Sequence, residues 1–548
     1  MIKIFTIFLF IIIPTYLFSQ VAEDRYRLYL SDKENNSFSL ESPEEFLSTE
    51  SIQRRIKQNI SIIENDLPVS NYYIDSLKNL GFRILNKSKW LNTVVVYSTD
   101  QQLIDTITSY GFIKSKNKSF VNLDSKSYLD LLKNQNLDAY SSNNVDYGNG
   151  TTQISMINGH ALHQNGYQGQ GITIAVIDGG FEGVNTLPAF DSLWQNNQIL
   201  GTRDFVDGDN EVFDASDHGM KVLSTMGANI PGSLVGTAPK ANYWLLRSEK
   251  TDDENSIEED NWAAAAEFAD SLGIDIITSS LGYTEFDKEY QNYSYSDLDG
   301  NSTFITKAAD IAASKGILVV NSAGNLGNDA WKYISAPGDG DSVLTVGAVD
   351  AFASIAYFSG LGPTYDGRIK PNVCAMGVKS AVQSLDGNIT VSNGTSFSAP
   401  IIAGMTACLW QRHPELNNME IIKKIEESAH QYSTPDNIMG YGIPDFAKAA
   451  ELINATNVSI VNDKAIITVY PNPFIDKVSI ELVSKINANS KIELYNSIGI
   501  KVRTSNIERN SNNSIIELSN LNDLPKGIYF IKISIGNQQL TKTISKIK

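Results

Sequence analysis

Cysteine and histidine are scarce in this chain. Its 548 residues include two cysteines, Cys374 and Cys408, which is too few for a scaffold held together by disulfides. The two thiols either pair or stay free and buried, and their wide separation does not match a metal site. Five histidines leave few candidates for a group that exchanges protons near pH 7. The formal net charge of −18 argues against a nucleic-acid partner.

Long hydrophobic runs are also missing, except at the start of the chain. Residues 1–19 combine an early lysine, an apolar run interrupted by Pro14 and a small residue, Ser19, before a polar stretch. This pattern predicts a secretory signal peptide rather than a permanent membrane anchor. No later segment has enough consecutive apolar residues to span a bilayer.

Residues 20–120 alternate strand patterns such as RYRLYL with helical patterns such as PEEFLSTESIQRRIKQN. They predict a small α+β domain. Within it, Arg54 and Arg55 fit a processing dipeptide, but a pair of arginines in such a helix is more typical of a solvated face. Residues 121–150 are polar and rich in Asn, Ser and Asp, as an exposed linker would be.

Residues 151–455 alternate buried strand patterns with helices. The run GITIAVIDGG, residues 171–180, is typical of a strand buried on both faces of a parallel sheet. Ser256 and Glu259 have capping-box spacing before an alanine-rich helix. Two more strand–helix rounds follow, so we predict an α/β domain with a mostly parallel sheet and helices on both faces.

Polar residues follow several of these strands. Asp178 ends the strand ITIAVI, Asn325 follows ILVVN, and His218 enters a helix. Reactive groups gather at the carboxyl ends of parallel strands, so these three residues are candidates for one site. His218 is the histidine best placed to act as a base, although a lone histidine is more often structural.

The stretch NGTSFSAPIIAG, residues 393–404, places Ser396 beside the expected start of a helix. Pro400 is comfortable only in the first turn of a helix, so the helix should begin near Ser396. Unpaired backbone N–H groups at that end would stabilise an oxyanion. Taken alone, the stretch favours the simpler interpretation of Ser396 as an N-cap.

Four motifs together resemble the subtilisin-like serine peptidases, or subtilases. GTSFSAP (394–400) resembles the serine motif of that family, VIDGG (176–180) the aspartate motif, DHG (217–219) the histidine motif and SAGN (322–325) the asparagine motif. They occur in the order of the family. The resemblance covers about residues 146–455 and implies a subtilisin-like fold.

The resemblance implies a role for each matching residue. Ser396 would be the nucleophile, His218 its base and Asp178 the partner of His218, with Asn325 in the oxyanion hole. The motif SSLG resembles the substrate-binding strand of the family, which makes Ser280, Leu281 and Gly282 the expected substrate-binding residues. The expected activity is that of a secreted serine endopeptidase that forms an acyl-enzyme and acts on proteins or peptides.

Two positions depart from the family pattern. Gly179 and Met220 stand where the family usually has a hydroxyl residue and a threonine, but neither position transfers a proton. The alternative function is a catalytically inactive, subtilase-fold surface binding protein, which usually lacks one of the triad residues. An esterase would need the pattern G-x-S-x-G, which GTSFS lacks.

The resemblance also interprets the two ends of the chain. Subtilases are commonly made with an N-terminal pro-domain, which residues 20–120 would form, with maturation in 121–150. The strand patterns of residues 464–548 predict a small all-β sandwich. From Lys464 onward the chain has 12 Lys or Arg residues and 6 Asp or Glu residues, which gives a net charge of +6. YPNPF and LPKGIYFIKI resemble the C-terminal sorting domain of type IX secretion cargo.

That resemblance implies an interaction with secretion machinery at the outer membrane. The protein would then be secreted or attached to the outer cell surface after export through the periplasm, as a monomer. The alternative for residues 464–548 is a carbohydrate-binding or surface-binding module.

Two acidic stretches, residues 204–214 and 251–260, raise the question of a metal. Subtilases often bind calcium in loops, but neither stretch has the spacing of a calcium loop, so solvated loops are expected. No catalytic metal or cofactor is required, and structural calcium stays open. If residues 251–260 border the cleft, they would favour basic residues in the substrate.

Overall fold

The computed structural model forms two compact units, Met1–Ala450 and Glu451–Lys548. It describes residues 25–119, 145–250, 254–287, 289–460, 467–472, 474–482, 490–496, 500–507, 515–535 and 538–547. The predicted signal peptide and most of the predicted linker lie outside the described residues. We call residues 25–119 the front domain, residues 145–450 the central domain and residues 467–547 the tail domain.

A seven-stranded sheet forms the centre of the central domain within the described residues. Its order is β13-β12-β11-β10-β5-β9-β6, and every neighbouring pair is parallel. This confirms the prediction of a mostly parallel sheet. The strands are β5 (Thr173–Asp178), β6 (Ile199–Asp204), β9 (Asn242–Arg247), β10 (Ile276–Ser279), β11 (Leu318–Ser322), β12 (Val343–Val349) and β13 (Val373–Met376).

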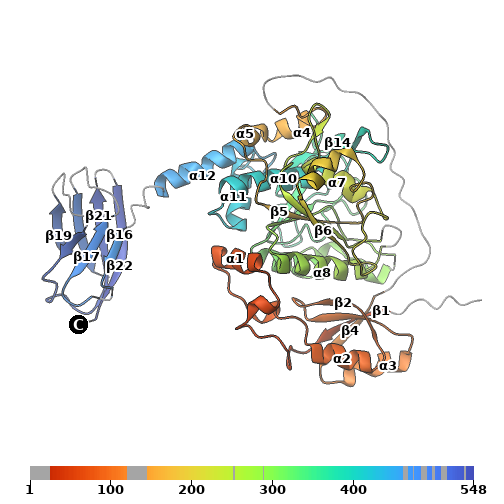
Figure 1. Ribbon diagram of the computed structural model, residues 1–548, viewed down its shortest axis with the longest axis horizontal. Helices are drawn as coiled ribbons and strands as arrows, with labels where there is room; N and C mark the ends of the chain where they lie inside the picture. The colour runs from red at the N-terminus through yellow and green to blue at the C-terminus, as the bar shows by residue number, and fades with distance from the viewer. Residues whose placement is uncertain are drawn as a thin grey trace, which may run out of the picture. The chain divides into compact units, whose positions relative to one another are not determined.

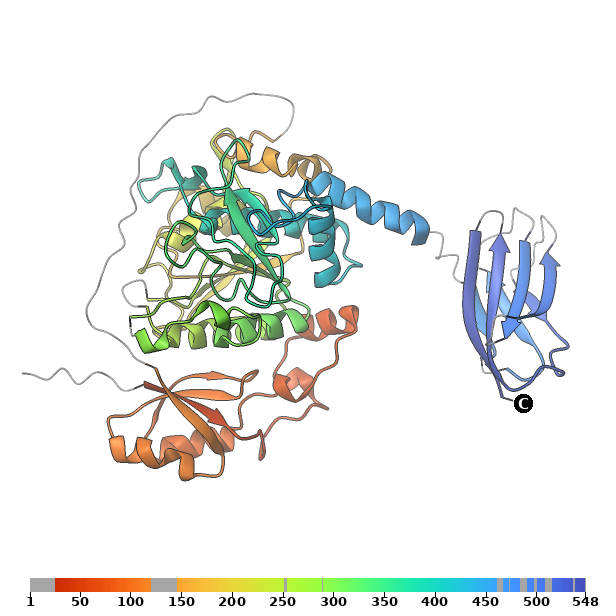
Figure 2. The same ribbon diagram turned by 180° about the vertical axis from the view of Figure 1, so that it is seen from behind.

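Helices cover both faces of this sheet (Figures 1 and 2). Ala175 and Ile177 of β5 pack into one core with α8 (Ile257–Leu272) and α9 (Phe304–Ser314). Helices α7 (His218–Gly227) and α10 (Thr395–Arg412) pack against the other face. The smaller elements are α4 (Thr151–Met156), α5 (His160–Gln164), α6 (Asp191–Gln195), α11 (Asn418–Ser428), α12 (Phe446–Ile460) and the hairpins β7–β8 (Asn229–Ile230, Leu234–Val235) and β14–β15 (Ser380–Gln383, Ile389–Ser392).

Helix α10 begins one residue before Ser396, as its sequence predicted. The N-cap is Gly394, whose φ of +148° is a conformation that residues with a side chain rarely adopt. Ser396 is therefore inside the helix, and its interpretation as an N-cap is wrong. Pro400 lies in the second turn rather than the first, so it leaves the carbonyl of Ser396 without its usual helical donor.

Helix α8 does not begin with the predicted capping box. Ser256 makes no side-chain capping hydrogen bond, and the hydroxyl of Tyr293 donates to Glu259 at 2.5 Å. The neighbouring Glu258 accepts hydrogen bonds from the backbone N–H groups of Lys250 and Asn255, at 3.0 and 3.2 Å. The capping-box prediction is wrong because Glu259 turns toward other partners.

The front domain is the small α+β domain that its sequence predicted. Its antiparallel sheet has the order β2-β3-β1-β4, and helices α2 and α3 share one apolar core with the sheet. The elements are β1 (Arg25–Leu30), α1 (Thr49–Gln58), α2 (Asn71–Asn79), β2 (Arg83–Ser88), β3 (Thr93–Tyr97), α3 (Gln101–Thr106) and β4 (Ile113–Ser119).

Buried ion pairs join the front domain to α8. Arg27 forms a bidentate pair with Asp260 at 2.6 and 2.7 Å. Arg54 and Arg55 both contact Asp270, at 2.6 and 2.9 Å. Neither arginine lies on a solvated helix face, because both are buried against the central domain. The expectation that residues 251–260 form a solvated loop is wrong for Glu258, Glu259 and Asp260, which are buried.

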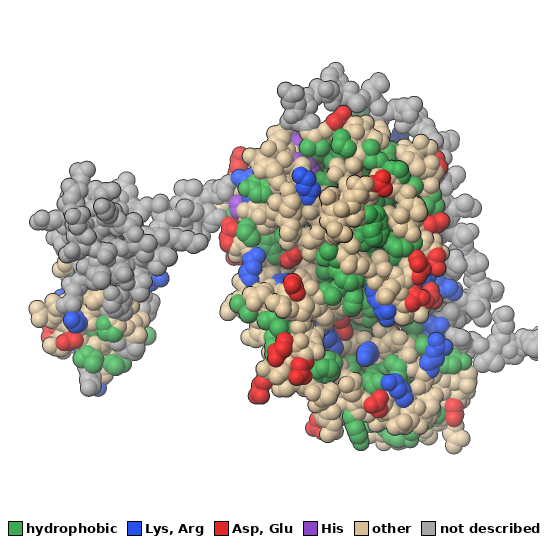
Figure 3. Space-filling model, in the orientation of Figure 1, with side chains coloured by type: hydrophobic (Ala, Val, Ile, Leu, Met, Phe, Trp, Pro, Cys, Tyr) green, Lys and Arg blue, Asp and Glu red, His purple; other side chains and the backbone are tan. Residues whose placement is uncertain are grey.

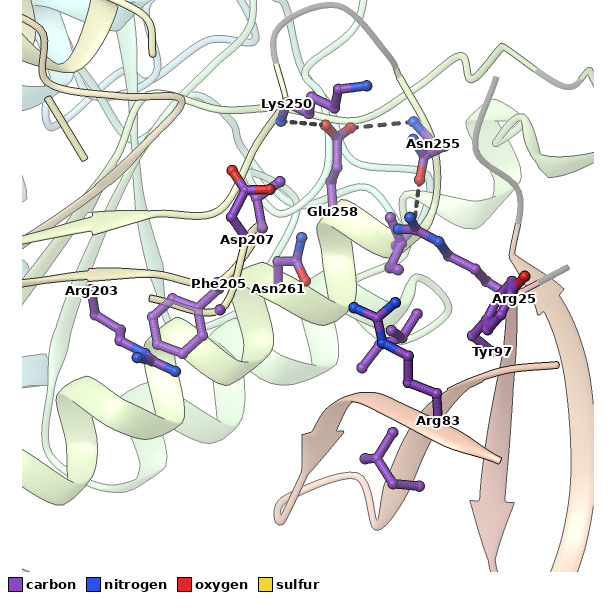
Figure 4. A pocket seen from close by; sticks show the side chains of 15 residues that line it. Arg25, Arg83, Tyr97, Arg203, Phe205, Asp207, Lys250, Asn255, Glu258 and Asn261 are labelled. Carbon is purple, nitrogen blue, oxygen red and sulfur yellow. Dashed lines mark hydrogen bonds between the residues drawn. The ribbon is translucent and has the colours of Figure 1, made fainter. Parts of the chain in front are cut away.

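Hydrogen bonds extend this interface along α8. Glu267 accepts from the Ser88 hydroxyl and from the backbone N–H groups of Lys89 and Trp90, at 2.5 to 2.9 Å. Near the first turn of α8 lies a cavity of about 560 Å³, toward which Arg25 and Arg83 of the front domain point (Figure 4). Figure 3 shows Lys and Arg side chains gathered near the boundary between the front and central domains. At this boundary, cations of the front domain therefore pair with carboxylates of the central domain.

The tail domain packs two antiparallel sheets around one apolar core, as predicted for a small β-sandwich. One sheet has the order β16-β17-β20 and the other β19-β18-β21-β22. The strands are β16 (Ile467–Tyr470), β17 (Val478–Leu482), β18 (Ser490–Asn496), β19 (Lys501–Ile507), β20 (Ile515–Leu518), β21 (Gly527–Ile535) and β22 (Gln538–Lys546).

The two alternatives for the cysteines are resolved. Cys374 and Cys408 are both free and buried, and burial raises the pKa of each thiol far above its usual range. Among the helices that the structure describes, none is long and apolar enough to cross a membrane.

We expect Asp270→Asn to lower the free energy of unfolding by about 3–5 kcal/mol, because it leaves Arg54, Arg55 and Lys89 without their shared buried counter-charge. Urea unfolding of the full chain measures this change, in a Ser396→Ala background that removes the predicted nucleophile. The matched control is Asp75→Asn, which breaks an exposed 3.5 Å pair with Lys78. It should cost at most about 1 kcal/mol, and equal effects of the two changes would contradict the interface described here.

The ion pairs of Asp270 also predict that the stability of the protein depends on pH. Burial tends to raise the pKa of Asp270, but Lys89, Arg54 and Arg55 hold it at about 2, below its ordinary value of 3.8. The contribution of Asp270 to stability is therefore present above pH 3.8 and is lost as the pH falls through about 2.

Candidate active site

The pair formed by Asp178 and His218 is the centre of the site. Asp178 is the last residue of β5 and its side chain has no exposed surface, while His218 is the first residue of α7. Nδ1 of His218 lies 2.7 Å from Oδ1 of Asp178. A carboxylate there accepts a hydrogen bond from the Nδ1–H group, which leaves Nε2 of the neutral ring as the proton acceptor.

The charge on Asp178 changes the proton affinity of His218. Burial tends to lower the pKa of His218, but the charge of Asp178 and the hydrogen bond to it outweigh burial and raise the pKa above 6.5. Glu249 also raises this pKa, and Lys221 lowers it. His218 is thus a stronger base than a free histidine.

The two departures from the family motifs leave this pair intact. The backbone N–H of Gly179 donates to Oδ1 of Asp178 at 2.8 Å, a contact that needs no side chain at position 179. Met220 is fully buried in α7. Both positions therefore support the pair through the backbone or through packing.

Ser396 lies in the first turn of α10, where backbone N–H groups have no helical partner. The hydroxyl of Ser280 donates to the Ser396 carbonyl at 2.8 Å, the carbonyl that Pro400 leaves free. Phe397, the next residue, has its ring centroid 6.0 Å from that of His218. These contacts tie the serine to the expected substrate strand and to the histidine helix.

Asn325 presents its amide to the same place. Its Oδ1 accepts from the backbone N–H and the hydroxyl of Thr395, at 2.9 and 3.0 Å, which leaves Nδ2 as the donor of the amide. A Cβ atom on Gly394 would lie 3.6 Å from both Nδ2 of Asn325 and the backbone N of Ser396. The two donors therefore flank one small space, as an oxyanion hole requires.

A cavity of about 450 Å³ adjoins these groups. Its walls include Asp178, His218 and Asn325 together with Ser280, Leu281 and Gly282, the residues expected to bind substrate. The structure thus brings together side chains that lie far apart in the sequence, at the carboxyl edge of the parallel sheet.

Sequence reasoning missed four other residues that line this cavity: Glu249, Leu326, Tyr333 and Ser335. Glu254, which also lines it, belongs to the acidic stretch 251–260 that was expected to favour basic substrates if it bordered the cleft. Glu249 could have been found, because it follows the buried strand NYWLLR at the same edge of the sheet. Tyr333 and Ser335 lie in a segment without a strand or helix pattern, so no local signal marked them.

No group of three or more His, Cys, Asp or Glu side chains suited to a metal occurs in the described ranges. Structural calcium therefore stays a prediction from the resemblance alone.

Comparisons with known proteins agree with this geometry. The profile of the subtilase family, Peptidase S8, matches residues 169–442, half of the chain. The profile of the peptidase S8 propeptide domain of Bacteroidota matches residues 25–135, and that of the secretion system C-terminal sorting domain matches residues 468–547.

Individual relatives match the central part of the chain. Subtilisin NAT of Bacillus subtilis subsp. natto is 30% identical over 280 residues, which cover 50% of this chain and 65% of that protein, slightly under two thirds of its length. Subtilisin of Bacillus pumilus is 29% identical over 302 residues, which cover 54% of this chain and 98% of that protein.

One solved structure supports the fold alone. The epidermin leader peptide processing serine protease of Staphylococcus aureus is 16% identical, with a TM-score of 0.54, and the match covers 79% of this chain and 99% of that one. Together, the parallel sheet, the four ordered motifs and the match over half of the sequence lead to one conclusion: the chain belongs to the subtilase family.

Proposed function

We propose that the protein is a serine endopeptidase of the subtilase type, made as a zymogen and exported. The observation that carries this proposal is the 2.7 Å contact between His218 and Asp178 at the wall of a cavity that Asn325 also lines. Hydrogen bonds from the first turn of α10 to Ser280 and Asn325, which line this cavity, support a place for Ser396 beside it. The proposed substrates are proteins or peptides.

The acylation step follows from these positions. His218 Nε2 takes the proton of the Ser396 hydroxyl while Oγ forms a bond to the carbonyl carbon of the peptide. Negative charge develops on the carbonyl oxygen, where Nδ2 of Asn325 and the N–H of Ser396 donate hydrogen bonds. Asp178 stabilises the protonated ring and keeps its tautomer.

Collapse of this intermediate breaks the C–N bond. His218 passes its proton to the leaving amine, and an acyl-enzyme remains on Ser396. A water molecule then gives a proton to His218 and attacks the ester, which releases the acid and restores the serine hydroxyl. No step in this cycle calls for a metal or another cofactor, and any calcium would serve stability.

The ends of the chain fit an exported zymogen. The front domain, which matches a peptidase S8 propeptide, would keep the protein inactive until it is cut away. The tail domain would address the protein to export machinery at the outer membrane, for release or attachment at the cell surface. The proposed mature enzyme works as a monomer.

The alternative is a surface protein that binds peptides without cutting them. Retention of Asp178, His218, Asn325 and Ser396 favours the enzyme, because a protein that only binds peptides needs neither the triad nor the oxyanion donor.

Substitution of the nucleophile separates these two functions. We expect Ser396→Ala to lower kcat about 10⁶-fold and Asn325→Ala to lower it about 10²- to 10³-fold, sizes taken from the same changes in subtilisin. Hydrolysis of a fluorogenic peptide by the trimmed protein measures both. Near-normal turnover by Ser396→Ala would end the proposal, while Cys374→Ala, at a buried thiol away from the cavity, controls for mutagenesis.

The acid limb of kcat/KM should report His218, which must be neutral to accept a proton. Because Asp178 and Glu249 raise the pKa of His218 against burial and Lys221, we expect the midpoint above pH 6.5, with activity falling below it. Glu249→Gln should move the midpoint to lower pH. A wild-type midpoint at or below 6.5, or one that Glu249→Gln leaves unchanged, would contradict this account.

Maturation should cut the chain within residues 121–150. Mass spectrometry of the secreted protein would then find a new N-terminus in that range, and Ser396→Ala should retain the front domain if the enzyme processes itself. A secreted active form that still begins at Gln20 or Val21 would contradict the zymogen proposal.

A further inference from the structure

The cavity beside the catalytic groups carries two carboxylates that the proposed mechanism does not use. Glu249 follows β9 and Glu254 precedes α8, and both line the cavity that Asp178, His218 and Asn325 also line. A peptide held at the catalytic groups would bring its side chains close to these two carboxylates.

Glu249 is held in position. The hydroxyl of Tyr283 donates to its Oε1 at 2.5 Å, and Tyr283 is fully buried and pairs with Ala336 as in an antiparallel bridge. Burial, together with the nearby charge of Asp178, raises the pKa of Glu249 to about 7 against the opposing effects of the Tyr283 hydrogen bond and of His218. A nearby cation would favour the charged carboxylate.

Among the described residues neither Glu249 nor Glu254 forms an ion pair, and the charge that lowers the pKa of Glu249 is that of His218, which is present only when the ring is protonated. Two carboxylates on helix α8 differ from them, because Asp260 forms an ion pair with Arg27 and Asp270 forms one with Arg54. The cavity acids also do not belong to any group suited to a metal within the described ranges. Their charge is left for something that enters the cavity.

A second feature of the same cavity also points to an outside partner. Ser335 is buried, with 3% of the residue exposed, and its hydroxyl oxygen is buried and has no hydrogen-bond partner. A Cβ on Gly282 or Gly324 would lie 2.1 or 2.7 Å from this oxygen, so it lies between two backbone segments that line the cavity. A buried hydroxyl without a partner is costly unless a ligand supplies one.

We infer that the cleft selects peptides that carry a lysine or arginine close to the cleaved bond, with the cationic end of that side chain paired to Glu249 and Glu254. This inference rests on the proposed peptidase function. It also accounts for the absence of a built-in counter-charge at these two carboxylates, because the substrate would supply it. A long side chain can keep its apolar stem against Leu281 while its charged end reaches the acids.

The test begins with a peptide library digested by the trimmed wild-type protein. Mass spectrometry of the products gives the position at which basic residues are enriched. Two matched peptides are then made, one with arginine at that position and one with citrulline, which has nearly the same shape without the charge. We expect kcat/KM to favour arginine by about tenfold or more.

Two variants assign this preference to the acids. Glu249→Gln/Glu254→Gln should bring the arginine-to-citrulline ratio close to one. Glu254→Gln alone should lower the ratio about threefold, and it keeps the Tyr283 contact because the Tyr283 hydroxyl donates to Glu249. The control is Glu285→Gln, an exposed acid outside the cavity lining, which should keep the wild-type ratio.

The outcomes separate the inference from the function beneath it. Hydrolysis by the wild type with equal rates for arginine and citrulline would overturn the inference and leave the peptidase proposal standing. A ratio that both cavity variants leave unchanged would overturn it as well. Absence of hydrolysis of every peptide by correctly trimmed protein would overturn the peptidase proposal and the inference together.

Discussion

The buried helix α10 is the element on which the site depends. Of its 18 residues, 16 are buried, so the sheet and its neighbouring helices determine where the helix starts. That start gives Ser396 a position and directs a backbone N–H toward the same space as the Asn325 amide. Pro400 adds one more constraint, because the carbonyl it leaves free is held by Ser280 from the expected substrate strand.

A second constraint is the concentration of carboxylates around α8. Asp260 and Asp270 of the helix are neutralised by arginines of the front domain, while Glu249 and Glu254 in the adjacent cavity form no ion pair among the described residues. The same acidic edge of the central domain would therefore serve two partners. Arginines of the front domain form ion pairs with α8 at this edge, and one basic side chain of a substrate would pair with the carboxylates of the cavity.

Much of this could be read from the sequence. Buried parallel strands leave apolar runs that end in polar residues, so Asp178 and Asn325 were visible as strand ends, and a short motif beside a helix start marked Ser396. Local patterns failed where the partner is distant. Arg54 and Arg55 look solvated by themselves, because Asp270 lies more than 200 residues away along the chain.

The central claim is that Ser396 is a nucleophile activated by His218. Treatment of the trimmed protein with a fluorophosphonate, followed by mass spectrometry of its peptides, tests this most directly. The account predicts one adduct on Ser396 that is absent when His218→Ala is treated in the same way. Folded, trimmed protein that takes no label, or a label on another serine that persists in His218→Ala, would contradict it.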